Sequence, residues 1–84
     1  MSSPVNLTIL YFAALREQAK QEREDISLPA PTDAAGLYAL LVERHGFTLP
    51  QSRLRPAVNH RFCSWQTELA DGDTVAFIPP VAGG

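Results

Sequence analysis

A strand-forming run near the carboxyl end, followed directly by two prolines, limits the possible folds of this chain most strongly. The run Thr74–Ile78 is rich in β-branched and aromatic residues, which favour a strand packed against a core. The preceding residues 71–73 (DGD) are typical of a turn, because Asp side chains bond nearby backbone N–H groups and glycine tolerates positive φ. Pro79 and Pro80 end the strand, since proline lacks an N–H group and fixes φ. We therefore expect the last strand to leave its sheet as an extended arm.

The expected arm narrows toward its tip, in the order Pro79, Pro80, Val81, Ala82, Gly83 and Gly84. Fully extended, it would reach about 20 Å. Its two glycines would pass through a channel that a larger residue would block. A frayed terminus is the alternative, but a rigid double proline set directly against a hydrophobic strand favours a functional arm. We predict one domain over residues 1–78 and an arm over 79–84, whose useful group is the Gly84 carboxylate.

The rest of the chain predicts an α+β fold. Alternating apolar residues at 5–13 and 23–28 predict two paired strands, and residues 14–21 have the composition of a short helix. Apolar spacings of three and four predict the main helix over 34–45, with Thr32 as N-cap and Gly46 in the left-handed position at its end. Residues 56–59 predict a further strand, and Phe62 and Cys63 a short return strand. Together with the last strand, this order predicts a mixed sheet of about five strands with one main helix and one short helix.

Alternation also predicts a second apolar face on this sheet. In the first strand, Leu10 and Phe12 point away from the side that carries Ile9. In the last strand, Ile78 points away from the side that carries Phe77. We expect Phe12, Phe62 and Ile78 to share a face that no helix covers, and we predict that they bind a partner protein.

Size and charge indicate the kind of partner. Eighty-four residues build one small domain with a thin core. The net charge is −2 and the seven Lys and Arg residues are spread along the chain, so we expect neither nucleic acid nor a membrane surface as a partner. The single Cys63, expected as a small buried hydrophobe, fits a reducing compartment. No signal peptide and no membrane-spanning run is evident, so we expect a cytoplasmic protein.

The sequence offers no catalytic machinery of its own. It contains no phosphate-binding glycine loop, no arrangement typical of a catalytic triad and no set of metal ligands. His45 is expected to complement the negative end of the main helix, and His60 has no second ligand at metal-binding spacing. We therefore predict no metal site and no stably bound cofactor.

Three segments together resemble a known family. They are residues 11–17 (YFAALRE), residues 57–59 (AVN) and residues 69–84 (LADGDTVAFIPPVAGG). The chain resembles the small subunits of molybdopterin synthase, which are ubiquitin-like sulfur carriers. The likeness extends over nearly the whole chain and implies the β-grasp fold, with the last strand beside the first.

The resemblance also implies a reaction sequence. An activating enzyme of the ubiquitin-E1 type would use ATP to adenylate Gly84, and a persulfide-bearing sulfurtransferase would convert the terminus to a thiocarboxylate. The arm, with Gly83 and Gly84 as functional residues, would then enter the large synthase subunit. There it would donate sulfur to cyclic pyranopterin monophosphate (precursor Z). A heterotetramer of two small and two large subunits is implied, because two sulfur atoms are needed per product.

Two other functions share the Gly-Gly end. A sulfur carrier for another pathway, such as thiamine thiazole synthesis, would dock on a different acceptor enzyme. A ubiquitin-like protein modifier, or a plain interaction module, would be linked to lysine amines or would do no chemistry at all. The YFAALRE segment and the FIPPV sequence favour the molybdopterin pathway.

Overall fold

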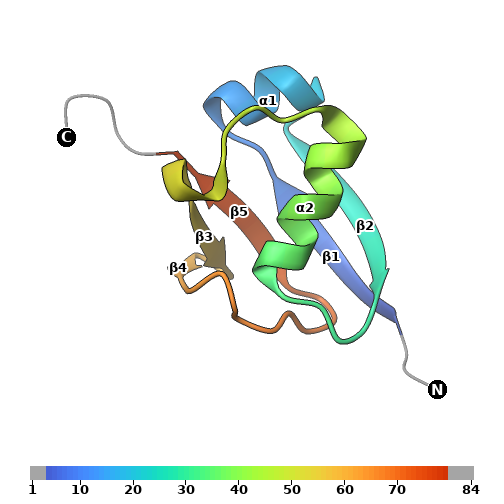
Figure 1. Ribbon diagram of the computed structural model, residues 1–84. Helices are drawn as coiled ribbons and strands as arrows, with labels where there is room; N and C mark the ends of the chain where they lie inside the picture. Colours follow the sequence, from blue (N-terminus) through green and yellow to red (C-terminus); the bar gives the residue numbers. More distant parts are fainter. Residues whose placement is uncertain (1–3, 80–84) are drawn as a thin grey trace.

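A computed structural model describes residues 4–79, which form a five-stranded mixed sheet and two α-helices (Figure 1). Along the chain the elements are β1 (Pro4–Leu10), α1 (Ala13–Ala19), β2 (Arg23–Pro29), α2 (Ala34–His45), the 3₁₀ turn η1 (Gln51–Arg53), β3 (Arg55–Val58), β4 (Arg61–Phe62) and β5 (Thr74–Ile78). The strand order is β2-β1-β5-β3-β4. β5 runs parallel to β1, and the other neighbouring strands are antiparallel. The predicted β-grasp fold and its α+β class are thus confirmed.

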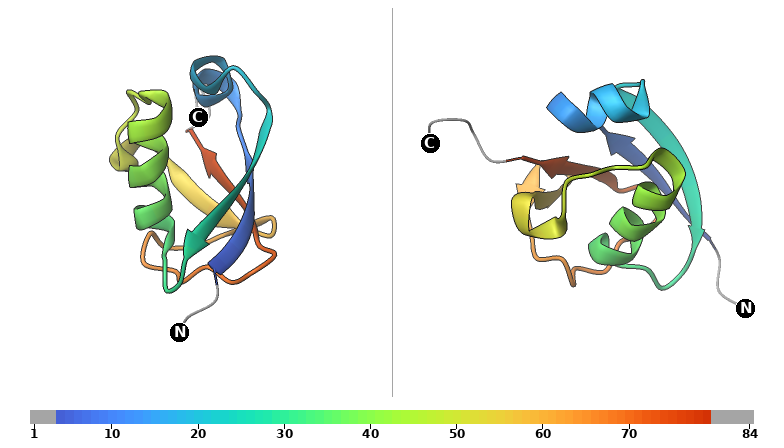
Figure 2. Two further views of the ribbon diagram at one scale, coloured as in Figure 1. Left: turned by 90° about the vertical axis from the view of Figure 1, so that its right-hand side faces the viewer. Right: turned by 45° about the horizontal axis from the view of Figure 1, so that its top comes forward.

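Helix α2 lies across one face of the sheet, as the two further views show (Figure 2). Alternate residues of β1 and β5 are buried beneath it, including Ile9, Val75 and Phe77, which are fully inaccessible. The intervening residues point to the opposite face, as the alternation predicted. The predicted first strand was too long, because Phe12 is the extended cap of α1 and the chain turns there at Ala13, whose φ is 51°.

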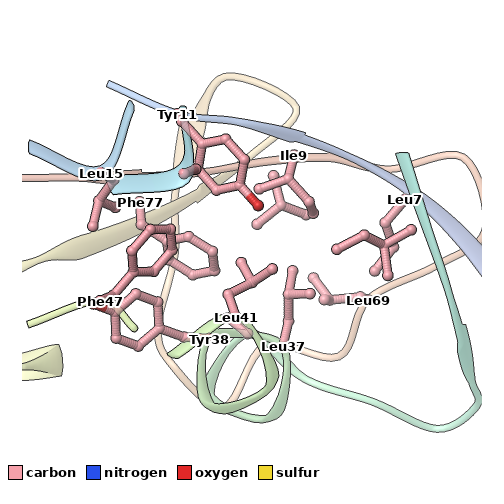
Figure 3. Close-up of a cluster of buried hydrophobic side chains, with 14 of the residues drawn as sticks. Leu7, Ile9, Tyr11, Leu15, Leu37, Tyr38, Leu41, Phe47, Leu69 and Phe77 are labelled. Carbon is pink, nitrogen blue, oxygen red and sulfur yellow. The ribbon is translucent and has the colours of Figure 1, made fainter. Parts of the chain in front are cut away.

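The core is a continuous cluster of aliphatic and aromatic side chains between α2 and the sheet (Figure 3). Phe77 lies among rings: its centroid is 5.0 Å from that of Tyr38 and 5.6 Å from that of Trp65. The packing role predicted for Trp65, the one tryptophan in the sequence, is confirmed, since it is half-buried against this cluster. Cys63 is only half-buried, less than expected, and its Sγ lies 3.8 Å from the carbonyl oxygen of Pro56.

The N-terminus of α2 is capped by Asp33, and the prediction that Thr32 caps it was wrong. An Asp33 carboxylate oxygen accepts a 2.7 Å hydrogen bond from the backbone N–H of Gly36. The N–H groups of Ala34 and Ala35 bond the carbonyls of Thr67 and Trp65, so the segment before β5 satisfies donors that a helix cannot satisfy alone. Thr32 lies one residue too early to be the cap: its carbonyl accepts a hydrogen bond from the N–H of Leu69, whereas Asp33 is the extended residue directly before the first helical residue.

The C-terminus of α2 follows the prediction. Gly46 has φ 71°, and its N–H donates to the carbonyl of Val42 at 2.8 Å. Within residues 4–79, no helix is long and apolar enough to span a membrane.

Candidate functional site

The central strand β5 determines where the arm begins. It lies between β1 and β3, with Ile9 opposite Val75 and Arg55 opposite Ile78. Pro79 follows directly and is half-buried. β1 pairs with residues 74–76 and β3 with residues 75–78, so Pro79 follows directly after an interior strand of the sheet. The predicted arm residues Pro80, Val81, Ala82, Gly83 and Gly84 lie outside the described residues.

The turn before β5 is tied to β1 by more than strand pairing. An Asp71 carboxylate oxygen accepts hydrogen bonds from the backbone N–H of Asn6 at 2.7 Å and from its side-chain amide at 3.0 Å. Gly72 has φ 90°, as expected for this turn, and its N–H donates to the carbonyl of Asn6. The expected bonding of these Asp side chains to nearby backbone N–H groups is found for Asp73, which accepts from the N–H of Ala70, but was wrong for Asp71, which bonds Asn6 on β1. These bonds connect the turn before β5 to β1.

The turn between β3 and β4 is also bonded to the start of β5. The Asn59 side-chain amide donates to an Asp73 carboxylate oxygen at 2.9 Å, and its oxygen accepts from the N–H of Thr74 at 3.0 Å. Asn59 has φ 51°, a left-handed conformation that asparagine tolerates well. The predicted return strand requires a turn here, but the sequence did not reveal its bonds to the start of β5.

The three residues predicted to bind a partner do lie on one face of the sheet. Phe12 and Phe62 are 45% and 54% exposed, the two large hydrophobic side chains that stand out as exposed among residues 4–79. With Ile78 they line a hollow of about 230 Å³. It lies on the side of the sheet opposite the core, because its strand residues alternate with the buried Ile9, Val75 and Phe77. The remaining residues of this hollow are Leu10, Ala57, His60, Thr74 and Ala76. We call these eight residues the helix-free face.

A larger groove adjoins this face where the arm begins. It has a volume of about 400 Å³ and shares Phe62 and Ile78 with the helix-free face. Its other lining residues are Ser52, Arg53, Leu54, Arg55 and Pro79. We call it the arm-root groove. Pro79, with which the predicted arm would begin, therefore lies at the junction of an apolar face and a groove with basic residues on its wall.

Sequence reasoning missed Ala76, Arg53 and Arg55 as members of this region. Alternation puts Ala76 on the same side of β5 as Ile78, but its small size gave no reason to single it out. Arg55 lies beside Ile78 because β3 pairs with β5, and Arg53 lines the groove from η1; no local sequence pattern indicates either position.

A half-buried carboxylate, that of Glu24, links β2 to the residue after β1 and to the end of α2. One oxygen of Glu24 accepts a hydrogen bond from the Tyr11 hydroxyl at 2.6 Å and lies 2.7 Å from His45 Nε2, while the other oxygen accepts from Arg44 Nη1 at 2.7 Å. Burial by itself raises the pKa of Glu24, but these hydrogen bonds outweigh it and hold the pKa below its ordinary value. Burial, reinforced by the hydrogen bond to Glu24, raises the pKa of Tyr11 above its ordinary value. We call this cluster the Glu24 clamp.

The clamp gives His45 a role that the sequence did not reveal. Its ring packs at 5.6 Å from Tyr11 and 5.3 Å from Phe47, between centroids, while its Nε2 meets Glu24. His60 lies in the turn after β3, with φ 70°. Within the described part of the chain, no group of three His, Cys, Asp or Glu residues is arranged to hold a metal ion.

The chain is similar to proteins whose function is known. The profile of the ThiS family matches residues 9–84. A molybdopterin synthase sulfur carrier subunit from Mycobacterium tuberculosis is 37% identical over 82 residues, which cover 95% of this chain and 99% of that protein.

Solved structures agree with this relationship. The putative molybdopterin converting factor subunit 1 from Pyrococcus furiosus has a TM-score of 0.79 at 32% identity, covering 92% of this chain and 99% of that one. A chain in the complex of subunits 1 and 2 of molybdopterin-converting factor from Helicobacter pylori has a TM-score of 0.66 at 27% identity, covering 95% of this chain and 100% of that one. The chain therefore belongs to the ThiS family, and it is related over nearly its full length to molybdopterin synthase sulfur carrier subunits.

Proposed function

We propose that this chain is the sulfur carrier subunit of a cytoplasmic molybdopterin synthase. The observation that carries the proposal is structural: an exposed apolar face adjoins the point where the paired central strand releases the arm, at Ile78 and Pro79. The family relationship supports the same function, because the relatives with full-length similarity are named as sulfur carrier subunits.

The proposed chemistry takes place at the Gly84 carboxylate. A carboxylate resists nucleophilic attack because its charge is delocalised, so it must first react with ATP to form an acyl-adenylate, releasing pyrophosphate. A persulfide then displaces AMP to give an acyl persulfide, and a thiol cleaves its S–S bond. The products of that cleavage are the thiocarboxylate and a disulfide. The thiocarboxylate sulfur is then the nucleophile that attacks cyclic pyranopterin monophosphate.

Other proteins would supply the catalytic groups. An E1-like adenylating enzyme would bind the ATP, a sulfurtransferase would carry the persulfide, and the large synthase subunit would hold the pterin substrate. Gly83 and Gly84 would enter the active sites of these enzymes, with Pro79 and Pro80 as a stiff stalk and Val81 and Ala82 as the narrowing part of the arm. A heterotetramer of two carriers and two large subunits would provide the two sulfur atoms of each product.

The helix-free face is proposed as the surface that docks on the large subunit. The Helicobacter pylori structure is a complex between the two subunits of the converting factor, which supports a large-subunit partner for this chain. Phe12 and Phe62 would supply exposed aromatic rings, which contribute strongly when an interface excludes water from them. Ile78 would extend the contact to the base of the arm.

Substitution of Ile78 tests this docking surface. Ile78→Asp places a charge in the centre of the proposed interface, and we expect it to weaken binding of the large subunit at least about 100-fold, the size of a strong interface contact. Phe12→Asp should also weaken binding of the large subunit. The melting temperature should change little, because neither side chain is fully buried. Binding is measured by titration calorimetry with the purified large subunit.

Ala39→Asp is the matched control, because it adds the same charge on an exposed position of α2, across the sheet from the proposed interface. It should bind as the unsubstituted chain does. If Ile78→Asp binds equally well, or if it unfolds the domain, the docking surface is wrong. If the unsubstituted chain does not bind the large subunit at all, the proposed function is wrong.

A further inference from the structure

The arm-root groove combines apolar walls with two arginines. Arg53 and Arg55 line it together with Leu54, Ile78 and Pro79, among others. Both arginines are exposed, and neither lies within ion-pair distance of a carboxylate in the part of the chain that the structure describes. The whole interval 44–67 contains no Asp or Glu, although the chain carries a net charge of −2. The groove is therefore a positive site on an acidic protein.

Arg55 is held in position within this groove. Its guanidinium carbon lies 4.1 Å from the centroid of the Phe62 ring, a cation–π contact. Its backbone is paired with that of Ile78, so the side chain rises from the strand beside the origin of the arm. A guanidinium that is already ordered loses less conformational entropy when it binds a carboxylate, and its planar donors match the two carboxylate oxygens.

The location of Arg55 indicates what it would meet. Phe62, against which it packs, belongs to both the arm-root groove and the helix-free face, so a protein docked on that face would also cover the groove. Covering an arginine without a partner removes its hydration at a cost, and a carboxylate of the docked protein offsets that cost. The apolar wall formed by Leu54, Ile78 and Pro79 favours aliphatic or aromatic neighbours of that carboxylate over a free, fully hydrated anion.

We propose that the arm-root groove receives an acidic side chain with apolar neighbours from the large synthase subunit, and that Arg55 pairs with it. This inference rests on the proposed function. The pair would lie beside Pro79 and would therefore align the arm as it enters the partner. Arg53, on the same wall, adds positive charge and strengthens the attraction.

The test compares the binding of the full chain and its variants to the purified large subunit. Arg55→Glu reverses the charge, and we expect Kd to rise at least about 30-fold, in the range measured for loss of a close interfacial charge pair. Arg55→Gln should show a smaller loss. It should also lose most of the salt dependence that the unsubstituted chain shows between about 0.05 M and about 0.5 M salt, over which screening of charges becomes strong.

Lys20→Glu is the matched control, because it makes the same change of charge at the exposed C-cap of α1, which lines neither the arm-root groove nor the helix-free face. Its Kd should stay within about threefold of the Kd of the unsubstituted chain. A larger rise would indicate a general effect of net charge and not a local charge pair. Circular dichroism confirms that each variant is folded. If Arg55→Glu fails to fold, Arg53→Glu on η1 serves in its place, with a weaker but measurable loss expected.

Three results would overturn the inference, and they can be told apart. Equal binding of Arg55→Glu and the unsubstituted chain refutes the pair while leaving the carrier function intact. If Arg55→Glu binds the large subunit normally but is no longer adenylated, the groove belongs to the activating enzyme. If the unsubstituted chain does not bind the large subunit, the inference falls together with the proposed function.

Discussion

Removal of the Tyr11 hydroxyl tests whether the Glu24 clamp stabilises the fold as an ionised cluster. Tyr11 is 2% exposed, and its hydroxyl donates a 2.6 Å hydrogen bond to Glu24. Tyr11→Phe deletes this bond with almost no change in shape. A hydrogen bond to a charged group contributes about 1.5–3 kcal/mol to the free energy of unfolding. In a domain of this size, where 1 kcal/mol shifts the melting temperature by about 4–8 °C, we therefore expect the melting temperature near neutral pH to fall by roughly 6–24 °C.

The loss of stability caused by Tyr11→Phe should depend on pH, and the direction of this dependence follows from the lowered pKa of Glu24. The stability that the ionised carboxylate contributes is fully present above its unfolded pKa of about 4.3, and it is lost as pH falls through the lower folded pKa. The difference between Tyr11→Phe and the unsubstituted chain should shrink over the same interval, because a protonated Glu24 is a weaker acceptor.

The raised pKa of Tyr11 predicts a second change on the alkaline side. Above about pH 10 the tyrosine ionises in the unfolded chain but stays protonated in the folded one, so stability falls as pH rises. Tyr11→Phe should lack the part of this loss that Tyr11 contributes. Thermal unfolding, followed by circular dichroism at a series of pH values, measures the change in stability on both the acid and the alkaline side.

Tyr38→Phe is the matched control, because the Tyr38 hydroxyl donates to the neutral backbone carbonyl of Leu49. It should cost about 1 kcal/mol, with no dependence on pH in the acid range. If Tyr11→Phe and Tyr38→Phe cost the same, and neither cost changes between about pH 7 and about pH 3, the reasoning about an ionised Glu24 is refuted.

Three further substitutions test the elements that position β5. Asp33→Ala removes the cap of α2 and should lower the free energy of unfolding by about 0.5–2 kcal/mol in urea, whereas Asp33→Ser should restore most of it. Gly46→Ala forces a Cβ into a left-handed conformation and should lower the free energy of unfolding by about 1–2 kcal/mol, while Gly46→Asn should lower it by less. Equal losses would contradict the left-handed conformation assigned to residue 46. Phe77→Ala empties the centre of the aromatic cluster and should cost about 3–5 kcal/mol, seen in the unfolding transition of Trp65 fluorescence; a loss below about 1 kcal/mol would show that the cluster repacks.

The pattern of apolar residues was enough to predict the sheet, because its signal is local. Alternation placed Ile9 and Phe77 in the core, and Phe12 and Ile78 on the other face, as the structure has them. Helix α2 was predicted to within its observed bounds for the same reason, with Gly46 at its end.

Features that depend on contacts distant in sequence could not be predicted. The partners of Glu24 come from the residue after β1 and from the end of α2, so no local pattern reveals the clamp. Asp71 bonds Asn6, 65 residues away in the chain. Arg55 gains its place in the candidate site only through its pairing with Ile78.

The central claim is that Gly84 carries sulfur, and the intact mass of the chain tests it most directly. The chain is incubated with an extract of its host, ATP and a sulfur donor, alongside a variant that lacks Gly84. The account predicts a mass gain equal to one oxygen replaced by sulfur, seen only in the chain that retains Gly84. An unchanged mass, or covalent attachment of the chain to lysines of other proteins, would contradict it and would favour a ubiquitin-like modifier or an interaction module.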